Sequence, residues 1–212
     1  GSPGASSPTS EELAIFDANT GAATCTVDQA VNVKGLVLES GSAVEITQGT
    51  NTITCGAAGI EVHDGAFNGG SGSINVNGPF EISSGVFTST SGNMELSGNF
   101  NQTGGSFVHN SGSIVISQTS VFAGATNNFN NIIINGTLTA PASLSILGNI
   151  ENNGTFNHNN GTVSFNGTTS VYGTSTTVFN NITISGTFTG HTNSFAITGS
   201  WNNNGTFLHN DG

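Results

Sequence analysis

The chain has 212 residues, of which only 6% are charged, with twelve Asp and Glu against one basic residue, Lys34, and a formal net charge of -11. Nucleic-acid binding needs a basic footprint for the phosphates, and anionic membranes attract basic segments, so the composition excludes both partners. The chain lacks a run of about 18 apolar residues, so we expect no membrane insertion.

The N-terminal third differs in composition from the rest. Residues 1–10, GSPGASSPTS, are predicted to be a flexible linker or an expression remnant. Eight of the twelve acidic residues precede residue 65. We therefore expect residues 11–77 to form a more acidic N-terminal part of the fold, with a short turn at its start that begins a cap.

This part holds the two cysteines of the chain, Cys25 and Cys55. A disulfide between them would close a loop of about 30 residues and stabilise the fold by roughly 3–4 kcal/mol. The alternative is two free thiols in neighbouring layers of the structure. The sequence leaves both interpretations open.

A short internal repeat begins at Gly78. Residues 78–97 and 98–117 align without gaps, so that Phe80 matches Phe100 and Phe87 matches Phe107. Each segment has three short apolar groups separated by Gly, Ser and Asn. This pattern predicts three short strands joined by tight corners, which is one turn of a coil.

A longer repeat covers residues 78–212. Near-copies begin at Gly98, Gly148 and Gly199, with starts 50 and 51 positions apart. A period of this size is typical of stacked repeat architectures. The chain stops inside the third copy, so we expect a fragment of a longer repetitive protein. The second half of each copy is the longer half, which suggests about 20–30 residues per turn of the coil.

These features predict an all-β fold, a right-handed parallel β-helix (β-solenoid). The sequence lacks the strict six-residue repeat that left-handed β-helices favour, so we expect the right-handed form. Tandem β-sandwiches are the alternative, because Asn-Gly hairpins would suit them as well. In the solenoid, the apolar positions shared by the copies form the predicted core stack: Phe80, Phe100, Ile150, Trp201, Phe87, Phe107, Phe156 and Phe207.

Asn-Gly pairs mark the predicted corners of the repeat. Both residue types tolerate positive φ, which we expect a tight corner to require. The corner residues predicted in this way are Asn135, Gly136, Asn153, Gly154, Asn204 and Gly205.

Three phrases carry a resemblance to a known group of proteins. They are Phe16-Asp17-Ala18-Asn19 with the following Ala23–Asp28, the repeated Gly-Asn-Phe/Ile…Asn-Gly-Thr-Phe, and Phe-Asn-Asn-Ile-x-Ile. The chain resembles, over most of residues 14–212, the repetitive β-helical segments of large bacterial surface and secreted, adhesin-like proteins. The resemblance implies an extracellular or cell-surface location and a role in adhesin stalks or surface layers.

Candidate metal sites are weak. His109, His158 and His209 recur one repeat apart, so we expect them about two turns, or about 10 Å, from one another. Zinc ligands lie only about 2.1 Å from the metal, so the three cannot share one ion. Calcium-binding solenoids need an Asp in each short repeat, where this chain has Asn and Ser. We expect no metal and no cofactor.

Catalysis on polysaccharides is not expected either. A glycoside hydrolase needs carboxylates that converge at a cleft. Glu81 and Glu95 flank one predicted turn but suit a solvated surface equally well. The chain has no Arg, and Lys34 stands alone as a cation. We therefore expect the protein not to be an enzyme.

The leading hypothesis is a non-catalytic stalk or spacer, with further repeats of the parent chain or other copies as partners. The first alternative is a carbohydrate-binding module for polysaccharides, although Trp201 and Tyr172 align with the core positions Phe100 and Phe122. The second alternative is ice binding through Thr137-Leu138-Thr139 and Thr187-Phe188-Thr189. Ice-binding solenoids present such a pair of threonines in every turn, whereas here the pair recurs only once in each copy of the long repeat. This spacing disfavours the second alternative.

Overall fold

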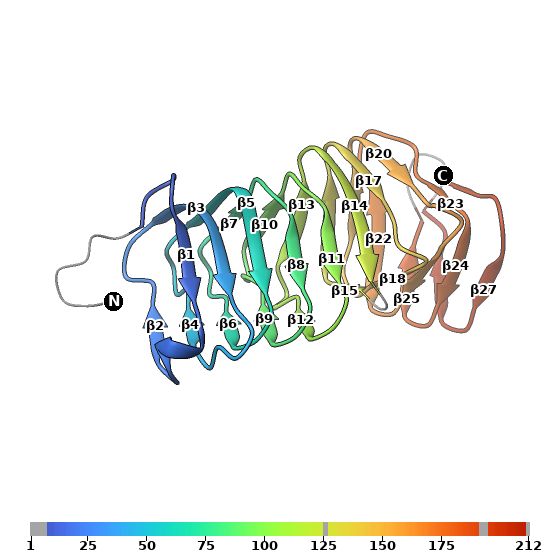
Figure 1. Cartoon of the computed structure of the whole chain (residues 1–212). Helices are drawn as coiled ribbons and strands as arrows, with labels where there is room; N and C mark the ends of the chain where they lie inside the picture. The colour runs from blue at the N-terminus through green and yellow to red at the C-terminus, as the bar shows by residue number, and fades with distance from the viewer. Residues whose placement is uncertain (1–7, 125–126, 191–194, 211–212) are drawn as a thin grey trace.

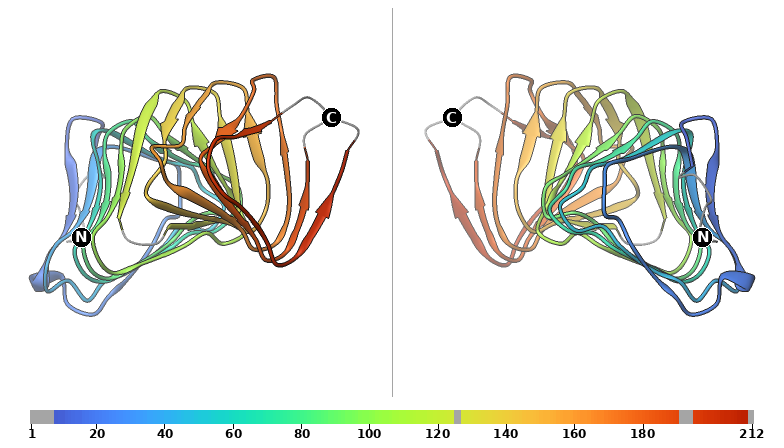
Figure 2. Two further views of the ribbon diagram at one scale, coloured as in Figure 1. Left: turned by 90° about the vertical axis from the view of Figure 1, so that its right-hand side faces the viewer. Right: turned by 90° about the vertical axis from the view of Figure 1, so that its left-hand side faces the viewer.

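The computed structural model describes residues 8–124, 127–190 and 195–210. They form a β-solenoid of about nine turns, in which the chain winds from one end of a rod to the other (Figure 1). The end-on views of Figure 2 show successive turns stacked behind one another around a common core. The one helical segment among the described residues is a short 3-10 turn, η1 (Ala18–Thr20), whose first amides Asp17 caps.

Each complete turn contributes three strands, one to each of three sides. The first side holds the leading halves of β3 (Val31–Leu38) and β5 (Ile53–Val62), then β7 (Ile74–Val76), β10 (Asn93–Leu96), β13 (Ser113–Ile116), β16 (Asn131–Ile134), β19 (Ile150–Asn152), β22 (Thr168–Tyr172), β25 (Thr187–Thr189) and β28 (Thr206–Leu208).

The second side begins with β1 (Leu13–Phe16) and the trailing halves of β3 and β5, because these long strands run round a corner. It continues with β8 (Phe80–Ile82), β11 (Phe100–Gln102), β14 (Thr119–Gly124), β17 (Thr137–Thr139), β20 (Thr155–Asn157), β23 (Val178–Phe179) and β26 (Ala196–Ile197).

The third side completes each turn. It holds β2 (Thr24–Thr26), β4 (Glu45–Thr47), β6 (Ala66–Asn68), β9 (Val86–Thr88), β12 (Ser106–Val108), β15 (Asn127–Phe129), β18 (Ser143–Ile146), β21 (Thr162–Phe165), β24 (Asn181–Ile184) and β27 (Trp201–Asn203).

Strand pairing confirms the predicted solenoid and rules out tandem sandwiches, because every ladder in the described chain is parallel. Paired residues are separated by 17 positions (Asn127 and Leu144) to 24 positions (Leu36 and Ile60). The expected turn length of about 20–30 residues was therefore too long at both ends of its range. The longer half of the repeat contains five strands, β14 to β18, which make one and two-thirds short turns and not one long turn.

The repeat does not correspond to a whole number of turns. The copy that begins at Gly98 contains the eight strands β11 to β18, and the copy from Gly148 contains β19 to β26. With three strands per turn, eight strands make two and two-thirds turns. Equivalent strands of successive copies therefore lie on different sides: β11 on the second, β19 on the first and β27 on the third.

This advance corrects the predicted core stack. Phe80 pairs with Phe100 and Phe87 with Phe107, in two separate columns. The remaining four have other partners in the ladder: Ile150 with Ile132, Phe156 with Leu138, Trp201 with Ile182, and Phe207 with Phe188. The eight residues thus belong to several columns, because equivalence in the repeat is not equivalence along the rod.

Aromatic rings fill much of the core. Phe87 is fully buried, and its ring stacks on Phe67 at a centroid distance of 4.5 Å. On the second side Phe80 stacks on Phe100 at 5.1 Å. The strands place these rings inside because every second residue of a strand points to the same face. The inward apolar residues of each turn therefore form one layer of the core.

Candidate functional site

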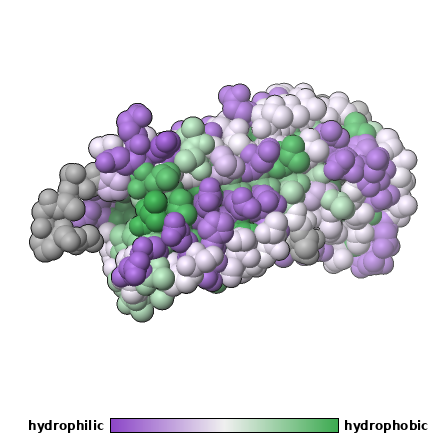
Figure 3. Space-filling model, viewed as in Figure 1, coloured by the Kyte–Doolittle hydropathy of each residue, from purple (hydrophilic) through white to green (hydrophobic). Residues whose placement is uncertain are grey.

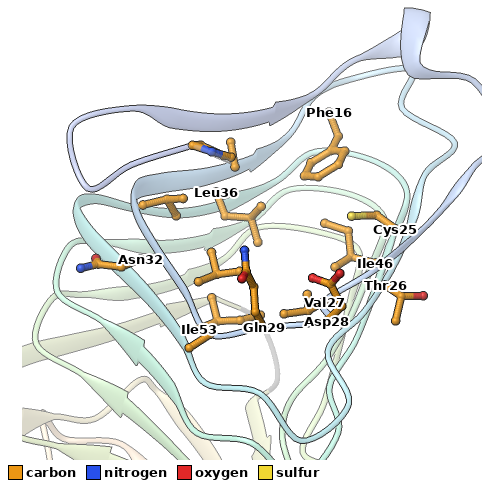
Figure 4. Close-up of a pocket in the computed structure, with 15 residues that line it drawn as sticks. Phe16, Cys25, Thr26, Val27, Asp28, Gln29, Asn32, Leu36, Ile46 and Ile53 are labelled. Atoms are coloured by element: carbon orange, nitrogen blue, oxygen red, sulfur yellow. The ribbon is translucent and has the colours of Figure 1, made fainter. Parts of the chain in front are cut away.

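A pocket of about 220 Å³ lies at the N-terminal end of the coil (Figure 4). Its walls are the inward side chains of the first turns, among them Phe16, Cys25, Leu36 and Ile46, while Asp28 and neighbouring polar residues line one part. The pocket is thus the first layer of the hydrophobic core, seen from the end of the rod, and not a cleft between elements.

Both cysteines are free thiols in the structure, which corresponds to the second of the two interpretations that the sequence left open. Cys55 is fully buried and lies between Val33 and Val76 in the ladder of the first side. Burial raises the pKa of the Cys55 thiol to about 12. Cys25 lies on the third side, paired with Ile46, and is only partly buried.

The three predicted Asn-Gly pairs lie between strands, at corners of the coil: Asn135-Gly136, Asn153-Gly154 and Asn204-Gly205. The reason given for them was wrong, since none of these six described residues has a positive φ. Glycine is needed there because successive turns touch. A Cβ on Gly136 would lie 2.1 Å from the carbonyl oxygen of Gln118 in the turn before it.

Among the described non-glycine residues, positive φ occurs instead at two of the His-Asn corners, those after His109 and His158. Asn110 and Ser111 have φ of 48° and 59°, and Gly112 N donates to the carbonyl oxygen of His109 at 3.0 Å. Two central residues with positive φ, closed by this bond, are the features of a type I′ turn. The imidazole Nδ1 of His109 accepts a bond from Ser111 N at 2.9 Å. The His109 side chain therefore stabilises the turn that it begins.

The equivalent histidines lie at three different corners. His109 follows β12 on the third side, His158 follows β20 on the second, and His209 follows β28 on the first. They are therefore not stacked two turns apart, as the period had suggested. The described part of the chain contains no group of three His, Cys, Asp or Glu residues that would hold a metal ion.

Carboxylates gather on the second side. Glu61 and Glu81 are partners in the ladder, and His63 bridges the same two turns, with Nε2 3.3 Å from Glu61 Oε2 and Nδ1 2.7 Å from Ser83 Oγ. Glu95 lies on the first side, so it does not converge with Glu81. The carboxylates thus lie along an open face without the cleft that a hydrolase needs.

The same face changes character along the rod. At its N-terminal end Leu13 and Ile15 are 41% and 50% exposed, and the row continues through Val37 to Glu61 and Glu81. Figure 3 shows this change from apolar to polar surface.

The two Thr-x-Thr phrases lie on different sides. Thr137–Thr139 forms β17 on the second side, and Thr187–Thr189 forms β25 on the first. Contrary to expectation, adjacent turns extend each phrase. One ladder runs Thr119, Thr137, Thr155 and the other Thr168, Thr187, Thr206. Each described ladder is three turns long.

Tyr172 corrects the prediction that it belongs to the core. Its side chain points outward from β22 and is 43% exposed, while the neighbouring Val171 is buried and pairs with Ile150. Trp201 does point inward, but it belongs to the last described turn and is 41% exposed.

The surroundings of Tyr172 are polar and ordered. Glu151 is its ladder partner, and Asn153 Nδ2 donates to Glu151 Oε1 at 2.8 Å. Asn153 Oδ1 in turn accepts from Thr174 N at 3.1 Å. The sequence interpretation selected Asn153 only as a corner residue, and it did not select Glu151 or Thr174 for a binding site. The available signal was strand alternation, which places Glu151 and Tyr172 on the same outward face once Val171 is assigned to the core.

No family model, curated protein or solved structure shows significant similarity to this chain. Within the described ranges, no helix has the length and apolar character needed to cross a membrane. The candidate sites are therefore argued from the geometry of this chain alone. The outward face around Tyr172 brings together an aromatic ring, the carboxylate of Glu151, the amide of Asn153 and the hydroxyl group of Thr174.

Proposed function

We propose that this chain is a non-catalytic spacer of an extracellular or cell-surface protein, which holds other parts of its parent chain at a fixed distance. The observation that carries the proposal is the continuous parallel ladder of about nine turns. Backbone hydrogen bonds link every turn to the next, and fully buried rings such as Phe80, Phe87 and Phe100 fill the interior. Such a rod resists bending because bending would break both the ladder and the core packing.

The distribution of the repeat supports a spacer. Because each copy advances by two and two-thirds turns, a motif that recurs in the sequence appears on a different side each time. The Thr-x-Thr phrases illustrate this, since their ladders lie on two sides. Ice binding requires one long flat face of such pairs, so we do not retain that alternative.

The surface chemistry suits an exposed location. Trypsin can cut only after Lys34, because the chain has one basic residue. Amide and hydroxyl side chains supply most of the outward polar groups in the second half of the rod. A surface of this kind offers few sites to proteases with basic specificity and keeps the rod solvated with few charges.

The spacer role can be tested by surface display. The chain would be placed between a membrane anchor and a small binding domain, and capture of a bulky immobilised partner would be measured. We expect capture to fall when the chain is replaced by a flexible Gly-Ser linker of about 20 residues, because a coil of that length spans roughly 25 Å on average. Nine stacked turns at about 4.8 Å each span about 43 Å. Equal capture with both linkers would contradict the proposal.

A carbohydrate-binding module remains a second candidate, because Tyr172 provides the exposed aromatic ring that this alternative requires. It is compatible with a spacer, since the ring lies on the flank of the rod.

A further inference from the structure

Two departures between the repeat copies meet at one place. The strand pair Asn101 and Ala123 in the first copy is replaced by Glu151 and Tyr172 in the second. The equivalence is structural as well as sequential. Gly124 and Gly173, which follow Ala123 and Tyr172, have φ of 119° and 123°. Thus an uncharged, small pair has become an acidic and aromatic pair on an otherwise equivalent scaffold.

The pair belongs to a platform three turns long. Ile133, Glu151 and Tyr172 are ladder partners that point outward from β16, β19 and β22. A polar row runs beside them at the corner: Asn153 Nδ2 lies 3.4 Å from Asn135 Oδ1, and Thr174 Oγ1 lies 3.3 Å from Asn153 Oδ1. Strands about 4.8 Å apart give this platform a length of roughly 10 Å along the rod.

The platform is held rigidly from beneath. Asn152 is fully buried and donates to Thr177 Oγ1 at 3.1 Å, and its carbonyl oxygen accepts from Ser175 N at 2.9 Å. These bonds fix the segment that follows Tyr172. A Cβ on Gly173 would lie 2.2 Å from the Asn152 carbonyl oxygen, so that segment lies directly against the preceding turn. A surface that is ordered before binding loses less entropy when a ligand arrives.

The chemistry of the platform fits a sugar ring. The face of an aromatic ring carries partial negative charge and attracts the weakly positive C–H groups of a pyranose. In the described chain, the phenol oxygen of Tyr172 and Oε2 of Glu151 have no protein hydrogen-bond partner. They are therefore available to sugar hydroxyls, and such placed polar groups give a site its orientation.

Charge decides which sugars can bind. Lys34 is the one Lys or Arg of a chain with net charge -11, and it lies in β3, several turns from Tyr172. Uronic acids and sulfated sugars would meet Glu151 without a compensating charge. We propose that Tyr172, Glu151 and Asn153 form a lateral binding site for a neutral polysaccharide of pyranose units. This proposal deepens the second candidate function and does not depend on the spacer role.

The test uses the full chain on an array of neutral oligosaccharides of glucose, mannose, galactose and xylose, with uronic acid, sulfated and chitosan oligosaccharides beside them. The best ligand is then titrated calorimetrically. We expect Tyr172→Ala to weaken binding roughly tenfold or more, as truncating an aromatic anchor does at other interfaces. Tyr172→Phe should retain most of the affinity. The matched control is Val121→Ala, which removes a side chain that is 42% exposed on another side.

A gain-of-site variant completes the test. Asn101→Glu with Thr103→Asn and Ala123→Tyr places the same three side chains at the equivalent positions of the first copy, and we expect it to add a second site per chain. Three results would overturn the proposal: no neutral ligand on the array, binding to charged glycans alone, or equal affinity in Tyr172→Ala. An unchanged stoichiometry in the graft would show that these three residues do not make the site. None of these results bears on the display experiment, so the spacer role is judged separately.

Discussion

Gly154 lies directly over Gly136 of the preceding turn, so close that a Cβ on Gly154 would be 2.0 Å from the Gly136 carbonyl oxygen. The same oxygen accepts a hydrogen bond from Thr155 N at 2.9 Å. The close approach and the ladder bond occur together, because the corner must be bare for the two turns to come within hydrogen-bonding distance. Glycine at this corner is thus a condition for stacking.

We predict that Gly154→Ala lowers the free energy of unfolding by about 1–3 kcal/mol, the usual cost of forcing a methyl group into a packed site. Denaturant unfolding followed by circular dichroism measures this. The control is Gly190→Ala, where the new Cβ would meet only ring carbons at 3.4 Å or more. Equal stability of the two variants would show that the turns can separate at the corner without cost.

The aromatic core gives a second prediction. Phe87 is fully buried against Phe67 and Phe80, so Phe87→Ala should destabilise the protein by about 3–5 kcal/mol. The adjacent Val86 is 39% exposed, and Val86→Ala should change stability by no more than about 0.5 kcal/mol. If the two substitutions cost the same, the alternation of inward and outward residues in β9 would be wrong.

Removal of one turn tests the register. Deleting residues 93–112 removes β10, β11 and β12 and joins Gly92 to Ser113, the ladder partner of Asn93. Ile114 then takes the place of Met94 on Ile74. We expect a folded monomer whose denaturant m-value falls by the share of one turn, since m follows the surface exposed on unfolding.

The control for this deletion is one residue longer. Deleting 93–113 instead would move Ile114 to the outward position of Asn93, and a slip of one residue sends every side chain of a strand to the opposite face. We expect this variant to be markedly less stable or to aggregate in size-exclusion chromatography. Identical behaviour of the two deletions would contradict the register.

Cys55 makes stability depend on alkaline pH. Burial raises the pKa of its thiol from 9.0 to about 12. Above pH 9 the unfolded chain loses this proton while the folded chain keeps it, so stability falls between pH 9 and 12, by at most about 1.4 kcal/mol per pH unit. Cys55→Val should remove this part of the pH dependence. Equal slopes for the two proteins in this range would refute the shifted pKa.

Pulling on the two ends should unwind the rod turn by turn. The ladder bonds run along the axis, so axial tension loads them one turn at a time. A turn of 17–24 residues releases about 60–80 Å of chain. Single-molecule force spectroscopy should therefore record steps of this length or small multiples. One step for the entire chain would show that the turns do not unfold separately.

The solenoid was predictable because short strands with inward apolar residues leave a direct trace in the sequence, as in residues 78–97 and 98–117. The turn length was not, because β14 changes partners midway. Phe122 pairs back to Phe100, whereas Ser120 pairs forward to Leu138, so one short strand serves two columns. Such a shift depends on contacts between turns and leaves no periodic signal.

The error at Tyr172 has a different cause, a one-residue offset between the two copies. An alignment of Val121-Phe122 with Val171-Tyr172 matches hydrophobicity but misplaces the strand by one residue. In the structure Val171 takes the equivalent place to Phe122, which leaves Tyr172 outward beside Glu151. The site proposed here depends on that single step of register, and sequence similarity between copies cannot determine it.

The fractional advance of the repeat has a consequence for how such a rod can change in length. Gain or loss of one copy adds or removes eight strands and turns everything beyond it by a third of a revolution. A sugar site on the flank beyond that point would then face a different side of the rod. Only a change of three copies would return the site to its original orientation about the axis. Variation in copy number therefore changes both the length of the rod and the direction in which a lateral site points.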